Sequence, residues 1–76
     1  MLNAGDKVKI KSFGWYLANK NSHDFIEKDG TKFVTTMKPF CSETVEIVEV
    51  LPDGAGYHID RDNQKHVWKE WMFQLD

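Results

Sequence analysis

Polar and apolar residues alternate along the first part of the chain, and this alternation is its clearest structural signal. Residues 5–12, GDKVKIKS, place Val8 and Ile10 on one face and three lysines on the other. A period of two residues is typical of a β-strand that buries one face. We therefore expect a strand here, preceded by a turn at Gly5.

In a second alternating segment, residues 43–51, the apolar side chains switch from one face of the strand to the other halfway along. Val45 and Ile47 share one face, whereas Val48 and Val50 share the other. Such a change predicts either a strand that is buried on both faces or a β-bulge that bends it.

The rest of the chain predicts shorter elements separated by turn residues. Residues 57–61 and 65–68 form two more strands joined by a turn at 62–64, and a helical turn at 69–71 precedes a brief last strand at 72–75. Pairing across this turn would set Ile59 against Val67. The predicted core consists of Val8, Ile10, Met37, Val45, Ile47, Ile59, Val67 and Met72.

A long excursion, residues 13–41, separates the first two strands. It contains helix formers at 15–20, enough for one or two turns, and an Asp-Gly pair at 28–31 that is typical of a hairpin turn. Residues 35–40 predict a loop or short turn closed by proline. Because long structureless loops are unusual in compact domains, we expect the excursion to pack its aromatic side chains on the sheet.

Together these elements predict one domain, residues 1–76, of the mainly all-β class. The order of strands, with a long first excursion and a helical turn before the last strand, favours a five-stranded SH3-like barrel, whose closure removes exposed strand edges. An open β-sheet that carries a short helix is the alternative.

Composition supports a folded domain. Of the 76 residues, 41% are hydrophobic and 13% aromatic, and the 29% that are charged are well interspersed. The single cysteine excludes an internal disulfide, and the chain shows neither a signal-peptide pattern nor an apolar run of about 20 residues. We therefore expect a cytoplasmic protein without a membrane segment.

Several positions spread over the chain resemble a family of short uncharacterised bacterial and phage proteins. The resemblance rests on residues 5–12, Trp15, Tyr16, Ala18, Asn19, Lys20, Phe33, Val34, Met37, Cys41, Val45, Ile47, Tyr57, Ile59, Asp62, Trp68, Met72 and Phe73. It implies an SH3-like fold and carriage on mobile or prophage-type DNA, and it implies no activity. Asn63 and Gln64 stand where the family often has glycines.

Four aromatic residues are the candidate binding site: Trp15, Tyr16, Trp68 and Trp71. In an SH3-like arrangement the excursion and the last helical turn flank a groove, where aromatic rings can stack on an extended peptide or surround a cation. The alternative is that these rings close a small core.

Basic residues concentrate in the first half of the chain. Residues 1–41 hold seven lysines against four acids, a net charge of +3, whereas residues 42–76 have a net charge of −5. Lys7, Lys9 and Lys11 would form a basic rim to the groove, or a face that neutralises phosphates. The alternative is a solvated strand face, because lysines commonly protect exposed strands.

Metal-binding and catalytic patterns are absent from the sequence. The three histidines and Cys41 show no paired spacing typical of a zinc site, and no phosphate-binding glycine loop or acid–base pair is recognisable. We therefore expect no cofactor, metal or catalytic residue. The sequence favours a non-enzymatic module that binds protein or peptide; a nucleic-acid-binding module is the alternative, and a phage-type structural or assembly protein is the third reading.

Overall fold

The computed structural model describes residues 2–63 and 65–74. Its strands are β1 (Lys7–Ile10), β2 (Ile26–Lys28), β3 (Thr31–Phe33), β4 (Thr44–Leu51), β5 (Gly56–Ile59) and β6 (Phe73–Gln74). Its helical elements are α1 (Phe13–Asn19) and three 3₁₀ turns, η1 (Thr35–Phe40), η2 (Pro52–Gly54) and η3 (Glu70–Met72). Gln64 and Leu75, which belong to the predicted turn and last strand, lie outside the described residues.

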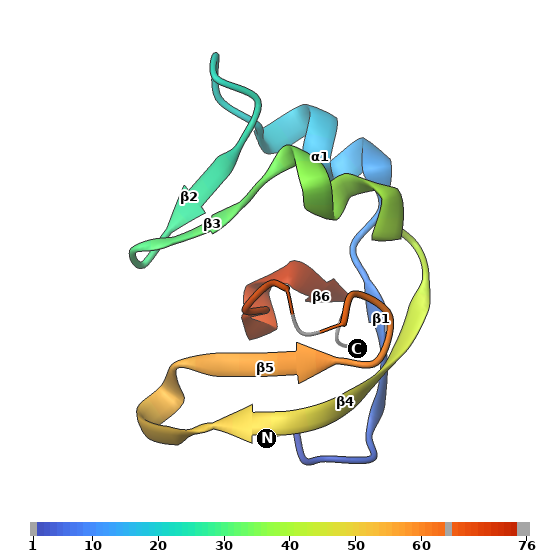
Figure 1. Ribbon diagram of the computed structural model, residues 1–76. Helices are drawn as coiled ribbons and strands as arrows, with labels where there is room; N and C mark the ends of the chain where they lie inside the picture. Colours follow the sequence, from blue (N-terminus) through green and yellow to red (C-terminus); the bar gives the residue numbers. More distant parts are fainter. Residues whose placement is uncertain (1, 64, 75–76) are drawn as a thin grey trace.

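The strands form two open antiparallel sheets (Figure 1). One sheet has four strands in the order β5-β4-β1-β6, and the hairpin β2-β3 forms the other. The predicted strand at 65–68 is reduced to one bridge, in which Trp68 pairs with Tyr57. The chain is therefore mainly β, as expected, but the strand pairings within residues 2–63 and 65–74 do not close into the five-stranded barrel that the sequence predicted.

The parity change in β4 is caused by a bulge. The register with β5 shifts between Ile47, which pairs with Ile59, and Glu49, which pairs with His58. The extra residue, Val48, is 40% exposed. After the bulge, Val50 lies opposite Tyr57, so the bulge brings Val50 back to the side of the sheet that Ile47 faces.

The excursion contains α1, the β2-β3 hairpin and η1, which lie above the four-stranded sheet in Figure 1. The Ser12 hydroxyl caps α1 by accepting a hydrogen bond from the Trp15 backbone N–H at 3.1 Å. Asp29 and Gly30 both adopt positive φ, 54° and 76°, as the tightest hairpin turns require. Both predicted elements are confirmed.

The core lies between the excursion and the sheet. Its buried hydrophobic residues are Val8, Ile10, Tyr16, Phe33, Met37, Val45, Ile47, Tyr57, Ile59, Trp68, Met72 and Phe73. Seven of the eight predicted core residues are among them, but Val67 is 40% exposed. The prediction for Val67 was wrong because Trp68 is the residue that pairs with Tyr57, and its neighbour in an extended segment must then point outward.

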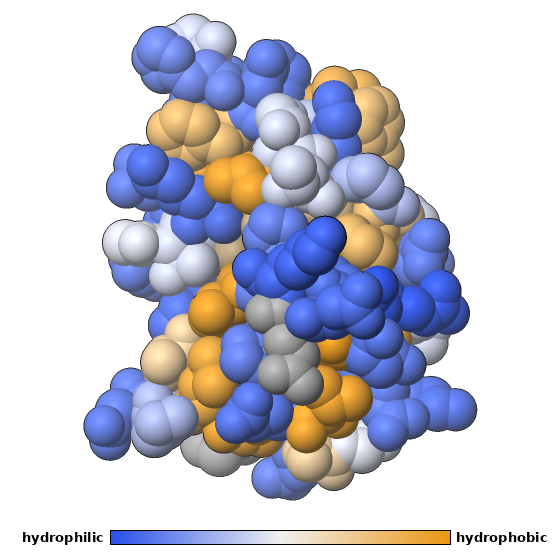
Figure 2. Space-filling view, viewed as in Figure 1, coloured by the Kyte–Doolittle hydropathy of each residue, from blue (hydrophilic) through white to orange (hydrophobic). Residues whose placement is uncertain are grey.

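The face of the molecule shown in Figure 2 is mostly hydrophilic, with separate hydrophobic patches, some over β4 and β5. Among the described residues, no helix has the length and apolar character that a membrane span requires.

Candidate functional site

Trp15 and Trp71 meet where α1 approaches η3. Their ring centroids are 6.1 Å apart and their planes are tilted by 52°. Trp15 also packs edge-on against buried Phe33, with centroids 5.2 Å apart, which fixes its position from the inner side. The two tryptophans remain partly exposed and form the outer layer of the aromatic core.

The backbone explains why these two elements lie together. The Lys11 N–H, one residue before the cap of α1, donates to the Met72 carbonyl at the end of η3, at 3.0 Å. Next to it, Ile10 in β1 pairs with Phe73 in β6. The first and last strands thus carry the helix and the 3₁₀ turn into contact, although 56 positions separate the two tryptophans in the sequence.

Trp68 and Tyr16 do not belong to this exposed site. Their side chains are 0% and 2% exposed. The Trp68 indole N–H donates to the Asp62 carboxylate at 3.0 Å, and the Tyr16 hydroxyl donates to the Asp24 carbonyl. Both are core residues, so half of the predicted aromatic set cannot touch a partner in this conformation. A chain this short depends on large rings to fill its interior.

Trp71 carries an unsatisfied polar group. Its Nε1 atom is buried, and no hydrogen-bond partner for it exists in the part of the chain that the structure describes. Buried N–H groups are almost always paired, because leaving one unpaired costs about 1–3 kcal/mol. Such an exception needs an explanation, and an acceptor from outside the chain is one that would satisfy this N–H.

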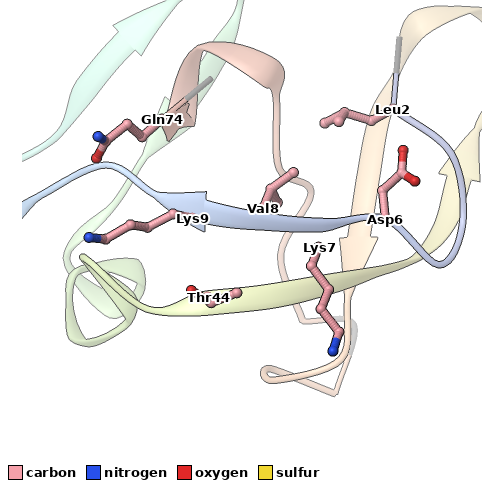
Figure 3. A pocket seen from close by; sticks show the side chains of 7 residues that line it. All are labelled: Leu2, Asp6, Lys7, Val8, Lys9, Thr44 and Gln74. Carbon is pink, nitrogen blue, oxygen red and sulfur yellow. The ribbon is translucent and has the colours of Figure 1, made fainter. Parts of the chain in front are cut away.

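The predicted basic rim divides into two parts. The Lys11 ammonium lies over the Trp15 ring, 5.2 Å from its centroid, and belongs to the tryptophan site. Lys7 and Lys9 project from the same side of β1, opposite to Val8 (Figure 3). They border an open hollow of about 500 Å³ lined by Leu2, Asp6, Lys7, Val8, Lys9, Thr44 and Gln74. Because Glu46 stands opposite Lys7 in the sheet and Asp6 lines the same hollow, this face is not uniformly basic.

The histidines and the cysteine do not assemble into a reactive centre. His58 Nδ1 lies 2.7 Å from the Glu49 carboxylate, and His66 Nε2 lies 3.1 Å from the Thr36 hydroxyl. Partial burial raises the pKa of the Cys41 thiol, which disfavours the reactive thiolate. Among the described residues, no three histidine, cysteine, aspartate or glutamate side chains are grouped as a metal site.

Two further hollows involve residues that the sequence did not single out for function. One, of about 360 Å³, is lined by Thr36, Phe40, Arg61, Asp62, Asn63, Lys65 and His66. The other, of about 320 Å³, is lined by Val50, Leu51, Gly54, Gly56, Tyr57, Lys69 and Glu70. No sequence motif marks either one, because each is assembled from segments that become neighbours only through the fold.

Comparison with known proteins gives no relative to guide the assignment. No protein-family model matches the chain, and neither a curated protein nor a solved structure matches it. The function must therefore be argued from the geometry of the site.

Proposed function

We propose that this domain is a non-enzymatic module that binds an extended segment of a partner protein on the surface formed by Trp15 and Trp71. The observation that carries the proposal is the pairing of two partly exposed indole rings from elements at opposite ends of the chain. One of them, Trp71, has a buried N–H that finds no acceptor among the described residues. Aromatic surfaces of this kind bind proline-rich or extended peptides in several domain families.

The chemistry of the surface suits a peptide backbone. Flat rings offer apolar contact area at little cost in side-chain entropy, since they are already held by Phe33 and by each other. Binding would require the Trp71 ring to turn until its buried N–H reaches a peptide carbonyl, and the Lys11 ammonium beside Trp15 would meet a second carbonyl or a carboxylate.

The proposal includes an SH3-like arrangement of the strands. The order β5-β4-β1-β6, extended by the bridge from Tyr57 to Trp68, supports it, as does the position of η3 directly before the last strand. In this arrangement the excursion and η3 flank the binding surface. An origin on mobile or prophage-type DNA, which the family resemblance implies, is part of the same proposal.

The proposal is tested by selecting binders from a displayed peptide library and measuring their affinity for defined variants. Trp15→Ala should weaken binding at least tenfold, and Trp71→Phe, which keeps a ring but removes the N–H, should weaken it about fivefold, as expected for one lost hydrogen bond. Leu17→Ala, which truncates a 51% exposed side chain on the same helix, should leave binding unchanged.

Circular dichroism must show that both tryptophan variants remain folded. If all three substitutions change the affinity of the selected peptides equally, or if none of them changes it, the binding site is not at the tryptophan pair.

A nucleic-acid-binding module is the second candidate, and one observation favours it. Lys7 and Lys9 project together from β1 beside Thr44 and Gln74, side chains that can contact phosphates (Figure 3). Affinity for single-stranded DNA should then fall between 50 and 200 mM salt, by about sevenfold if two phosphates are contacted. Lys7→Ala together with Lys9→Ala should remove it.

A further inference from the structure

The Lys11 ammonium is a charged group held at the tryptophan pair. It lies over the Trp15 ring, 5.2 Å from the ring centroid. Both backbone polar groups of this lysine are bonded, because its N–H donates to the Met72 carbonyl at 3.0 Å and its carbonyl accepts from the Ser42 N–H at 3.2 Å. The fold therefore keeps this positive charge beside the surface on which the peptide is proposed to lie.

No carboxylate in the part of the chain that the structure describes forms an ion pair with Lys11. The helix that carries Trp15, α1, contains no charged residue. Glu43 lies beside the end of β1, where its carbonyl accepts from the Ile10 N–H, but its carboxylate pairs with Arg61 at 3.0 Å. The charge of Lys11 is thus left without a salt bridge by the segments around it.

The charged side chains at η3 are directed to a different place. Glu70 and Lys69 line the hollow beside Tyr57, and Trp71 does not contribute to that hollow. Burial raises the pKa of Tyr57, and the negative charge of Glu70 raises it further, as expected for a carboxylate near that hydroxyl. The Lys69 ammonium donates to the Gly54 carbonyl at 2.6 Å. Neither charge therefore competes with or cancels the one at the tryptophan pair.

The end of β1 adds a second positive charge on the same side. Lys9 is exposed and lies two positions before Lys11, and side chains two positions apart in extended chain share a face. Its partners in the neighbouring strands, Thr44 and Gln74, are uncharged. The margin of the tryptophan surface toward β1 is therefore positive, which favours an anionic group on a bound segment.

We propose that Lys11 selects peptides that carry an aspartate or glutamate side chain next to the residues that contact Trp15 and Trp71. An ammonium that already lies over an indole ring loses little freedom when it binds an anion. A hydrogen bond from it to a carboxylate is also stronger than one to a neutral carbonyl. This inference rests on the proposed function, to which it adds the chemical class of the partner: an acidic extended segment.

The test begins with random peptides displayed on phage, their C-termini joined to the coat protein so that every carboxylate belongs to a side chain. Selection on the wild-type chain should enrich aspartate and glutamate over asparagine and glutamine about threefold or more at one position. Selection on Lys11→Gln should lose this enrichment, and selection on Lys32→Gln should keep it. Lys32 is the matched control, because its ammonium also lies over an aromatic ring, 4.8 Å from the centroid of Phe25.

A double-mutant cycle on one selected peptide separates an ion pair from a merely structural role of Lys11. Replacing the acidic residue of the peptide by its amide should weaken binding to the wild-type chain about threefold to fivefold, as expected for a partly exposed ion pair. High salt should reduce this difference. On Lys11→Gln, which circular dichroism must show to be folded, the same change in the peptide should have no effect. Equal losses on both proteins would overturn the inference.

The outcomes also separate this inference from the proposed function. If peptides require both tryptophans but their preference for acidic residues does not depend on Lys11, only the charge selection fails. If that preference depends on Lys11 while Trp15→Ala and Trp71→Phe leave the affinity unchanged, the tryptophan site fails and the lysine contact stands. If selection yields no peptide at all, both fail.

Discussion

Gly56 shows how closely single residues are fitted where β5 begins. Its φ is +136°, a conformation that side chains with a Cβ rarely adopt. A Cβ added there would lie 2.6 Å from Cγ1 of Val67 and 2.7 Å from the Trp68 carbonyl oxygen. The backbone of β5 can therefore approach the segment around Trp68 only because this position has no side chain.

We predict that Gly56→Ala lowers the free energy of unfolding by about 2 kcal/mol or more, because the strained φ and the contact with backbone cannot both be relieved. Urea denaturation followed by tryptophan fluorescence measures this change. Gly14→Ala is the matched control: a Cβ there meets nothing closer than 3.7 Å, and in α1 it should be neutral or stabilise by up to about 1 kcal/mol. Equal effects of the two substitutions would contradict the steric argument.

At the scale of elements, Asp62 organises the connection between β5 and η3. Its carboxylate is 5% exposed and accepts hydrogen bonds from the Trp68 indole at 3.0 Å and from the His66 backbone N–H at 3.2 Å. These bonds place Trp68 in the core where a regular hairpin partner of β5 was expected.

We predict that Asp62→Ala destabilises the domain by about 2–3 kcal/mol, since it leaves a buried indole N–H and a backbone N–H without their acceptor. The change is measured as a shift of the urea midpoint at constant slope. Glu27→Ala, an exposed carboxylate on β2, should change stability by less than about 0.5 kcal/mol. A loss for Asp62→Ala no greater than for Glu27→Ala would show that these bonds do not hold the segment.

Elements that depend on local chemistry could be predicted from the sequence. The alternation around Val8 favours a strand, and Asp29–Gly30 favours a tight hairpin turn; in each case few other local conformations suit the residues. The register of residues 65–68 could not be predicted, because it depends on hydrogen bonds from the His66 backbone and the Trp68 indole to the Asp62 side chain, which no alternation of polar and apolar residues reveals. For the same reason, sequence alone could not separate buried Trp68 from partly exposed Trp71.

At the scale of the whole molecule, the excursion and the sheet share one core. Phe33 from β3 packs against Trp68, with ring centroids 5.9 Å apart, and also against Tyr16 of α1 at 5.7 Å. Met37 of η1 is buried in the same cluster. The excursion is therefore not an independent lobe, and its tryptophan is held by the same interior that supports the sheet.

We predict that the chain unfolds in one cooperative transition and that Phe33→Ala lowers its stability by about 3–5 kcal/mol, as expected for a large buried ring. Far-ultraviolet circular dichroism, which reports on the strands, and tryptophan fluorescence, which reports on the aromatic core, should give coincident curves. Two separate transitions would mean that the excursion unfolds on its own.

The bulge at Val48 also affects how copies of this chain can meet. Ile47 in β4 hydrogen-bonds to the segment before β1, and the bulge follows Ile47 directly. Beyond this point the margin of the sheet along β4 is open to solvent. An irregular, twisted margin is a poor template for a strand from a neighbouring molecule. We therefore expect the domain to resist stacking into fibrils through this margin, even though two exposed valines lie along it.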